Sequence, residues 1–294
     1  NGYAGTDFCS SSLTGEQLHN ACRALVDDGV SGILATLITD GIQSLVSKLA
    51  EIVRLRELDE LARQVISGFH VEGPFLNPSP GFIGAHEPEH VCPASVDDAQ
   101  RLLDAGAGLV KLFTLAPEQD AGAAVTKSLA EQGVVVSAGH CDPTLDQLKT
   151  AIDNGLSMVT HFGNGCPVEL PRHDNVLQRY LSLREHLWFC FIPDGAHVDF
   201  IALKNYLDFV GVDRSIMTTD AISAAKMGPG LHEISGISVE VDEAGVARRP
   251  GSPNLAGSTI TMPGIRRNLS ESLGLGEDEI TALVDLNPRA ALSL

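Results

Sequence analysis

The sequence has no apolar run long enough to cross a membrane, because its hydrophobic stretches are short and are interrupted by glycine or by charged residues. A membrane-spanning helix needs about 20 consecutive, mostly apolar residues. Nor does the chain open with a basic segment followed by an apolar one, the pattern of a secretion signal. We therefore expect neither a membrane span nor a secretion signal.

Positive charge is scarce: 20 lysines and arginines stand against 38 aspartates and glutamates, which gives a net charge of −18. Binding to nucleic acid requires clustered cations that neutralise phosphates, and binding to anionic membrane surfaces requires basic patches. The charge balance argues against both. It leaves room for a small phosphorylated ligand, because one buried arginine can outweigh a diffuse negative field at short range.

Paired cysteine spacing is also missing. In a chain of 294 residues, scattered cysteines indicate free thiols in a reducing cytoplasm rather than a disulfide framework. The six are Cys9, Cys22, Cys92, Cys141, Cys166 and Cys190.

Short apolar runs alternate along the chain with longer amphipathic stretches. Such continuous apolar runs are typical of strands in a parallel sheet that is buried on both faces. Strands separated by helices at this spacing indicate a repeated strand–helix architecture. We predict strands at residues 32–38, 65–71, 108–114, 134–138, 158–161, 188–192 and 215–219. We predict helices at residues 15–28, 41–64, 119–132, 144–154, 199–209 and 262–273.

These strands fit an α/β fold, a (β/α)8 TIM-like barrel, but number one fewer than that barrel needs. Residues 1–8 are rich in glycine and resemble the loop after a first strand, so we expect that strand upstream of residue 1. We treat residues 1–294 as one barrel. Residues 234–249 depart from the alternation and predict an inserted β-hairpin with its turn at 243–245, either covering part of the mouth or lying on the surface.

Ionisable residues recur where the predicted strands end, and in a parallel barrel the functional side chains project from those carboxyl ends. They are Glu72, His140, His161, His197 and Asp220. One such histidine alone is most simply a half-buried imidazole bonded to backbone. All five would converge above the barrel axis, and burying that many ionisable groups without a metal ion or ligand is costly.

One carboxylate and two imidazoles, from Glu72, His140 and His161, are a familiar ligand set for a catalytic Zn²⁺ that keeps a position open for water. Such an ion lowers the pKa of the water and polarises a carbonyl group. Asp220 would take the proton from the water and pass it to a leaving amine, or would be an additional ligand. The ligand types suit Zn²⁺ best and tolerate Fe²⁺.

Nine motifs, in a consistent order, cover nearly the whole chain. They read NGYAGTDF at 1–8, HVEGPFLN at 70–77, GAHEP at 84–88, TLAPE at 114–118, VSAGH at 136–140, THFGN at 160–164, DGAHVD at 194–199, TDA at 219–221 and LAGS at 255–258. In these motifs the chain resembles the N-acetylglucosamine-6-phosphate deacetylases of the amidohydrolase superfamily. The resemblance implies an amidohydrolase barrel that removes acetate from an N-acetyl amino-sugar 6-phosphate.

The resemblance also assigns roles. It implies Glu72, His140 and His161 as metal ligands and Asp220 as general base and acid, and it places His86 near the scissile carbonyl, where it would stabilise the developing oxyanion. The substrate-binding residues that it implies are Asn164, Gly165, His197 and Arg172.

In the family, an arginine like Arg172 reaches the substrate phosphate of the neighbouring subunit, so the resemblance implies a homodimer. Asn1-Gly2 matches the form in which a first-strand His-x-His pair is replaced, which favours a single metal ion. Two features depart from the family. The loop at 164–176 lacks the usual residues around Arg172, and the family's small β-sandwich domain is missing.

Two other functions remain open: an amidohydrolase for another N-acyl or cyclic amide substrate, and a non-catalytic sugar-phosphate binding paralogue. His70, two positions before Glu72, points to the same side of its strand and would be either a supporting partner or a second ligand. Cys141 and Cys166 lie near the predicted site, but neither has the base partner that a cysteine nucleophile requires.

Overall fold

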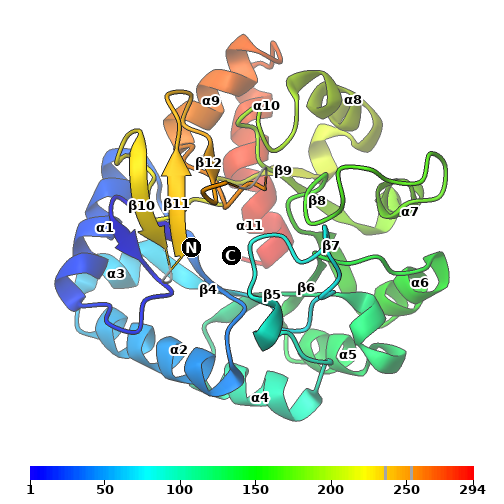
Figure 1. The fold of residues 1–294 in the computed structure, drawn as a ribbon, viewed down its shortest axis with the longest axis horizontal. Coiled ribbons are helices and arrows are strands. Elements are labelled where there is room, and N and C mark those ends of the chain that lie inside the picture. The colour runs from blue at the N-terminus through cyan, green and yellow to red at the C-terminus, as the bar shows by residue number, and fades with distance from the viewer. Residues whose placement is uncertain (235–236, 252–253) are drawn as a thin grey trace.

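A seven-stranded parallel sheet forms the centre of the computed structural model, which describes residues 1–234, 237–251 and 254–294. Its strand order is β3-β4-β5-β6-β7-β8-β9, so consecutive strands of the chain are neighbours in the sheet. Figure 1 shows these strands curling around the centre, with most helices outside them and the last helix, α11 (Asn287–Leu292), near the centre. The strands are β3 (Ile33–Ile38), β4 (Ile66–Glu72), β5 (Val110–Leu115), β6 (Val135–Ala138), β7 (Leu156–Val159), β8 (Trp188–Phe191) and β9 (Ser215–Met217).

This architecture is a TIM-like α/β fold, and it confirms the fold class predicted from the sequence. Each of the predicted strands is present, with ends that differ from the prediction by no more than two residues. The strands are apolar along their length because both faces are buried. Phe69, Phe113, Val136 and Phe189, from four different strands, have no exposed surface.

Capping side chains set the helix boundaries. α1 (Gly15–Asp27) begins at Thr14, whose hydroxyl accepts from the backbone of Gln17 in a capping box. The single helix predicted at 41–64 is two helices, α2 (Ile42–Glu57) and α3 (Glu60–Val65). Asp59 accepts a hydrogen bond from the Ala62 N–H and starts the second helix. The apolar periodicity continues across this break and could not reveal it.

Most of the remaining helices complete the outer layer, whereas the last one packs through Ala291 and Leu292 on a cluster of strand residues inside the curl of the sheet. The sequence pattern missed several of the shorter helices. The remaining helices are α4 (Val96–Ala105), α5 (Ala124–Glu131), α6 (Leu145–Asp153), α7 (Val176–Ser182), α8 (Phe200–Val210), α9 (Met262–Glu271), α10 (Glu277–Thr281) and α11 (Asn287–Leu292). Short 3₁₀ turns lie at Pro88–His90, Pro117–Gln119, Ala121–Ala123, Arg184–His186 and Val212–Arg214, and a π turn at Ala282–Leu286. Among the described residues, no helix has the length and apolarity that a membrane span requires.

Two small antiparallel sheets lie outside the main one. β1 (Gly2–Tyr3) pairs with β2 (Thr6–Asp7). β10 (Gly230–Ile234), β11 (Ile237–Val241) and β12 (Ala247–Arg248) form a three-stranded ribbon. β11 and β12 enclose the turn expected within the 234–249 segment, while residues 235–236 of that segment lie outside the described residues. The ribbon packs on a small apolar cluster of its own, formed by Ile222, Ala224, Val239, Val241, Ala247 and Ala256.

Candidate active site

The ionisable residues predicted from the sequence lie at or just beyond the carboxyl ends of neighbouring strands. Glu72 is the last residue of β4, and His140, His161 and Asp220 follow β6, β7 and β9. Backbone hydrogen bonds tie these turns to the adjacent strand: Gly139 N–H donates to Leu115 O at 3.2 Å and Thr160 N–H to Ala138 O at 2.9 Å. The sheet itself therefore fixes where these side chains start.

Three of these side chains meet at one point. Glu72 Oε1 lies 2.9 Å from His161 Nε2 and 3.2 Å from His140 Nε2, and the two imidazole nitrogens are 3.0 Å apart. All three residues are buried, with exposed fractions of 3–7%. Their donor atoms form a group that could hold a metal ion, with a donor set of one carboxylate and two imidazoles.

The hydrogen bonds around His140 fit a metal site. Its Nδ1 lies 2.7 Å from the carbonyl oxygen of Phe82, which places the ring proton on Nδ1. Nε2 then carries the lone pair and faces Glu72 and His161. A metal-bound histidine commonly donates its other ring N–H to a backbone carbonyl in this way. His161 Nδ1, by contrast, is buried with no hydrogen-bond partner in the described part of the chain.

Burial and mutual charge shift the pKa values of this group in different directions. Burial opposes ionisation of Glu72, but hydrogen bonds from His140, His161 and His86 outweigh it and hold the pKa of the carboxyl well below its ordinary value. Burial, together with the charge of His86, lowers the pKa of His140 to about 4. For His161 burial is outweighed by Glu72 and Asp220, which raise its pKa. Glu72 is thus ionised and His140 neutral, the protonation states that metal ligation requires.

Asp220 faces the same point from β9 and is half-buried. Its Oδ1 accepts a hydrogen bond from the side-chain amide of Asn1 at 3.1 Å. Burial and the nearby charge of Glu72 raise the pKa of Asp220 above its ordinary value. A carboxyl group with a raised pKa is suited to accepting a proton and releasing it again near neutral pH.

Three of these residues have an unusual backbone conformation. His140, His161 and Asp220 have φ values of +51°, +32° and +46°, in the left-handed region that few non-glycine residues adopt. Strain of this kind is found where the surrounding structure over-determines it, commonly at functional sites. Glycines accommodate the crowding: a Cβ on Gly165 would lie 3.0 Å from His140 N, and one on Gly84 would lie 2.8 Å from the His140 ring.

His86, on the loop after β4, joins the group from the side. Its Nε2 is 3.2 Å from His140 Nε2 and 3.8 Å from Glu72 Oε1. Its Nδ1 lies 2.8 Å from Thr39 Oγ1 and accepts from the Thr39 N–H at 3.4 Å. Because the Thr39 backbone can only donate, Nδ1 acts as the acceptor, which leaves Nε2 to carry the ring proton on the cavity side.

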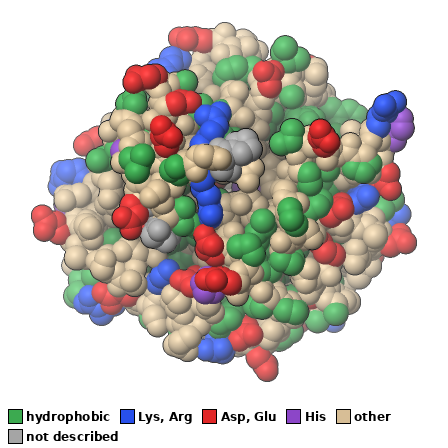
Figure 2. Space-filling model, viewed as in Figure 1, with side chains coloured by type: hydrophobic (Ala, Val, Ile, Leu, Met, Phe, Trp, Pro, Cys, Tyr) green, Lys and Arg blue, Asp and Glu red, His purple; other side chains and the backbone are tan. Residues whose placement is uncertain are grey.

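These residues line one cavity of about 540 Å³, which contains Glu72, His86, His140, His161 and Asp220 together. Figure 2 shows the surface hollowed near its centre, with Lys or Arg side chains beside the hollow. A second cavity, of about 670 Å³ inside the curl of the sheet, touches His161 and Asp220 but neither of the other two predicted ligands. The full constellation therefore faces only the first of these two cavities.

The sugar-binding residues implied by the resemblance divide into two groups. Asn164, Gly165 and His197 line the cavity. The ring of His197 is oriented by Asp194, whose carboxylate lies 2.6 Å from Nδ1. Arg172 is exposed and does not line this cavity of its own chain.

Comparisons with known proteins point to one family, although no family model matches the chain. The chain is 31% identical over 229 residues to the N-acetylglucosamine-6-phosphate deacetylase of Lysinibacillus sphaericus, covering 78% of this chain and 58% of that protein. It is superposable, with a TM-score of 0.90 and 30% identity, on a Mycobacterium smegmatis N-acetyl-D-glucosamine-6-phosphate deacetylase mutant in complex with N-acetyl-D-glucosamine-6-phosphate, covering all of this chain and 75% of that one. The chain belongs to the N-acetylglucosamine-6-phosphate deacetylase family.

One relative of the chain is named for a different amino sugar. An N-acetylgalactosamine-6-phosphate deacetylase from Escherichia coli O157:H7 is 28% identical over 267 residues, covering 91% of this chain and 69% of that protein. The chain spans less than two thirds of the Lysinibacillus deacetylase, so family membership is shown for the part that it covers.

Other candidates from the sequence take no direct part in this deacetylase-family site. Both ring nitrogens of His70 face threonine hydroxyls, Thr36 at 3.2 Å and Thr114 at 2.7 Å, so His70 supports the site from below. Cys141 is buried against the Tyr180 hydroxyl. Cys166 lines the cavity, but burial raises the pKa of its thiol to about 11, which leaves little thiolate at neutral pH.

Sequence reasoning missed two residues of this site. Thr39 directly follows β3, so applying the carboxyl-end rule to the first predicted strand would have found it. Arg249 lines the cavity beside the ribbon and bonds to Ala85 and Glu87, which precede it by 164 and 162 positions in the chain. No local pattern signals a contact over that separation.

Proposed function

We propose that this chain is the catalytic barrel of an enzyme that hydrolyses the acetamide of an N-acetyl amino-sugar 6-phosphate. The barrel comprises residues 1–294, with the segment 234–249 as an insertion. The products are acetate and the amino-sugar phosphate. The observation that carries this proposal is the meeting of Glu72, His140 and His161 beside Asp220 in one cavity. The names of the relatives supply the substrate class.

The buried Glu72 carboxylate and the imidazole nitrogens of His140 and His161 fit one divalent ion. Zn²⁺ suits this donor set best, with Fe²⁺ as the alternative. When bound, such an ion supplies Lewis-acid polarisation of a carbonyl group and makes a water molecule more acidic.

Asp220 is the acid and base of the proposed reaction. Its carboxylate takes the proton from the attacking water and returns it to the nitrogen of the amino sugar as the C–N bond breaks. The Asn1 amide holds Oδ1 and leaves Oδ2 to exchange the proton. The raised pKa of Asp220 suits both halves of this exchange.

His86 stabilises the oxyanion that develops when water adds to the acetamide carbon. Its Nδ1 is occupied by Thr39, so the proton on Nε2 is directed to the cavity. A pre-oriented donor of this kind lowers the barrier because it needs no rearrangement as charge develops.

The sugar phosphate lies against Asn164, Gly165 and His197, which line the cavity. We assign Arg172, exposed in its own chain, to the phosphate in the site of a second copy, which makes the enzyme a homodimer. The free state of all six cysteines supports a reducing, cytoplasmic location.

Acetate release tests the proposal. The protein loaded with one equivalent of Zn²⁺ is incubated with N-acetylglucosamine-6-phosphate or N-acetylgalactosamine-6-phosphate, beside a chelated sample and Asp220→Asn. Metal-dependent release from at least one sugar, abolished in Asp220→Asn, is the expected result. No release from either sugar by the metal-loaded protein would contradict the proposal and direct the search to other N-acyl substrates.

A further inference from the structure

The ribbon and the loop that carries His86 are joined across the mouth of the cavity by one side chain. Arg249 follows β12, and its Nη2 donates to the carbonyl oxygen of Ala85 at 2.7 Å and to Glu87 Oε1 at 2.9 Å. These two acceptors flank His86 in the sequence. Arg249 thus bonds to the backbone of the residue before the proposed oxyanion donor and to the side chain of the residue after it.

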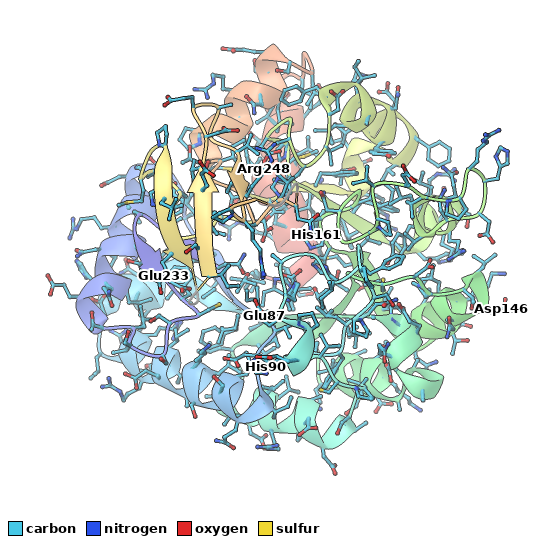
Figure 3. All side chains as sticks on the ribbon, in the orientation of Figure 1. Glu87, His90, Asp146, His161, Glu233 and Arg248 are labelled. Carbon is cyan, nitrogen blue, oxygen red and sulfur yellow. The ribbon has the colours of Figure 1, made fainter. Side chains whose placement is uncertain are left out.

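Figure 3 shows Arg248, at the end of the ribbon, and Glu87, on the loop after β4, on either side of the central region where His161 lies. Arg249, next to Arg248 in the sequence, bonds to Glu87 and is half-buried: 33% of its side chain is exposed, and 40% of that of Glu87. Its Nε is shielded from solvent. A partly buried ion pair with a second bond to a backbone carbonyl is stronger than an exposed pair.

Arg248 provides the contrast. It neighbours Arg249 and also lines the cavity, but its ion pair, at 3.1 Å, is with Asp242 of the same ribbon. The side chains of that pair are 41% and 47% exposed. Arg248 therefore bonds within the ribbon, whereas Arg249 connects the ribbon to the catalytic loop.

We propose that Arg249 is a positioning residue that fixes His86 over the reacting carbonyl by clamping Ala85 and Glu87. This role rests on the proposed function. His86 is otherwise held at its ring by Thr39, and its loop has few regular backbone bonds, among them His86 N–H to Ile83 O at 3.2 Å. The ribbon thereby becomes part of the catalytic apparatus although it contributes no reacting group.

The test is a set of kinetic measurements on the Zn²⁺-loaded protein with N-acetylglucosamine-6-phosphate. Arg249→Ala should lower kcat about 10- to 100-fold with little change in KM, because a displacement of about 1 Å at a reacting group costs that much. Arg249→Lys should recover only part of kcat, since an ammonium lacks the planar fork of the guanidinium. Arg54→Ala, the control at an exposed arginine on α2 outside the cavity, should leave kcat within about twofold, as expected for an exposed ion pair.

A double variant separates action through His86 from a general structural role. In the His86→Ala background, Arg249→Ala should add little to the loss, because residues that act through one group are not additive. Full additivity would overturn the proposal. An unchanged kcat in Arg249→Ala would also overturn it. So would a rise in KM for the phosphorylated sugar without a rise for N-acetylglucosamine, because Arg249 would then be a substrate ligand.

Amide hydrogen exchange of residues 81–90 decides the clamp without using the reaction. Arg249→Ala should speed exchange in this segment, while Arg248→Ala should leave it unchanged. If the wild-type protein releases no acetate, the proposed function fails and the exchange result still stands by itself. If acetate is released and exchange in Arg249→Ala is unchanged, the positioning role fails and the function stands.

Discussion

The floor and the rim of the cavity are built differently. The floor residues, Glu72, His140 and His161, lie at or near strand ends, are nearly fully buried, and bond to one another. The rim residues come from loops and the ribbon: Asn164 and Gly165 lie on the loop after β7 and are half-buried, and Arg249 reaches the site only through its own long side chain. The sheet therefore fixes the chemistry, whereas the rim sets access and the fit of the substrate.

This difference predicts where substitutions are tolerated. The segment at 164–176 supplies rim residues such as Asn164 and Gly165, and there a substitution need not disturb the packed sheet. A change at the floor would leave a buried charge without its partner, which costs several kcal/mol. Substitutions at the floor should therefore affect metal binding and kcat. Those at the rim should change KM or, as at Arg249, act on kcat through the order of the loop that carries His86.

Glu72→Gln should have the largest effect. Loss of the carboxylate removes the anionic ligand and leaves two imidazoles, so bound Zn²⁺ should be lost and kcat should fall on the order of 1,000-fold. Metal content by atomic absorption and acetate release measure the two effects. A variant that retains stoichiometric metal and near wild-type turnover would show that Glu72 is not a ligand.

Asn1→Ala comes next. Its amide donates a side-chain hydrogen bond to Asp220, and losing a hydrogen bond to a charged group should reduce kcat about 10- to 100-fold while metal content stays the same. Asn1→Asp should be worse, because a second carboxylate would repel Asp220. If Asn1→Asp matched the wild type, Asn1 would have no part in orienting the acid and base.

Arg172→Ala should act on binding rather than on turnover. Loss of one guanidinium–phosphate contact should raise KM about tenfold for the phosphorylated sugar, with kcat within about twofold. Arg54→Ala, an exposed arginine on α2, is the control. A mixture of Arg172→Ala with inactive Asp220→Asn tests the dimer. In the hybrid, the copy that keeps Asp220 receives Arg172 from the other copy, so a shared site predicts the KM of the wild type.

Glu118→Gln should have the smallest effect, on stability alone. Burial and the nearby Asp142 raise the pKa of Glu118, so its stabilising, protonated form is lost as pH rises through the folded-state pKa. The free energy of unfolding of the variant relative to wild type should therefore increase between pH 4 and pH 8. Urea titrations measure it, with exposed Glu60→Gln as a control that shows no such trend.

The sequence alone predicted the β/α architecture and the group at Glu72, His140 and His161 because both follow from local patterns: continuous apolar runs and the residues at their ends. It missed the break at Asp59, where a cap overrides an uninterrupted apolar periodicity. It also missed Arg249, because that contact depends on how the ribbon folds back over the mouth. What remained hidden are contacts made in space by side chains from distant segments.

The positive φ values at 140, 161 and 220 limit which amino acids these positions can hold. β-Branched residues are excluded there, while asparagine, aspartate, histidine and glycine are tolerated. Three of these four residue types also bind metals or carry protons. The turns after β6, β7 and β9 thus narrow the substitutes that these positions accept, and glycine, the residue that fits them with least strain, would remove the reactive group altogether.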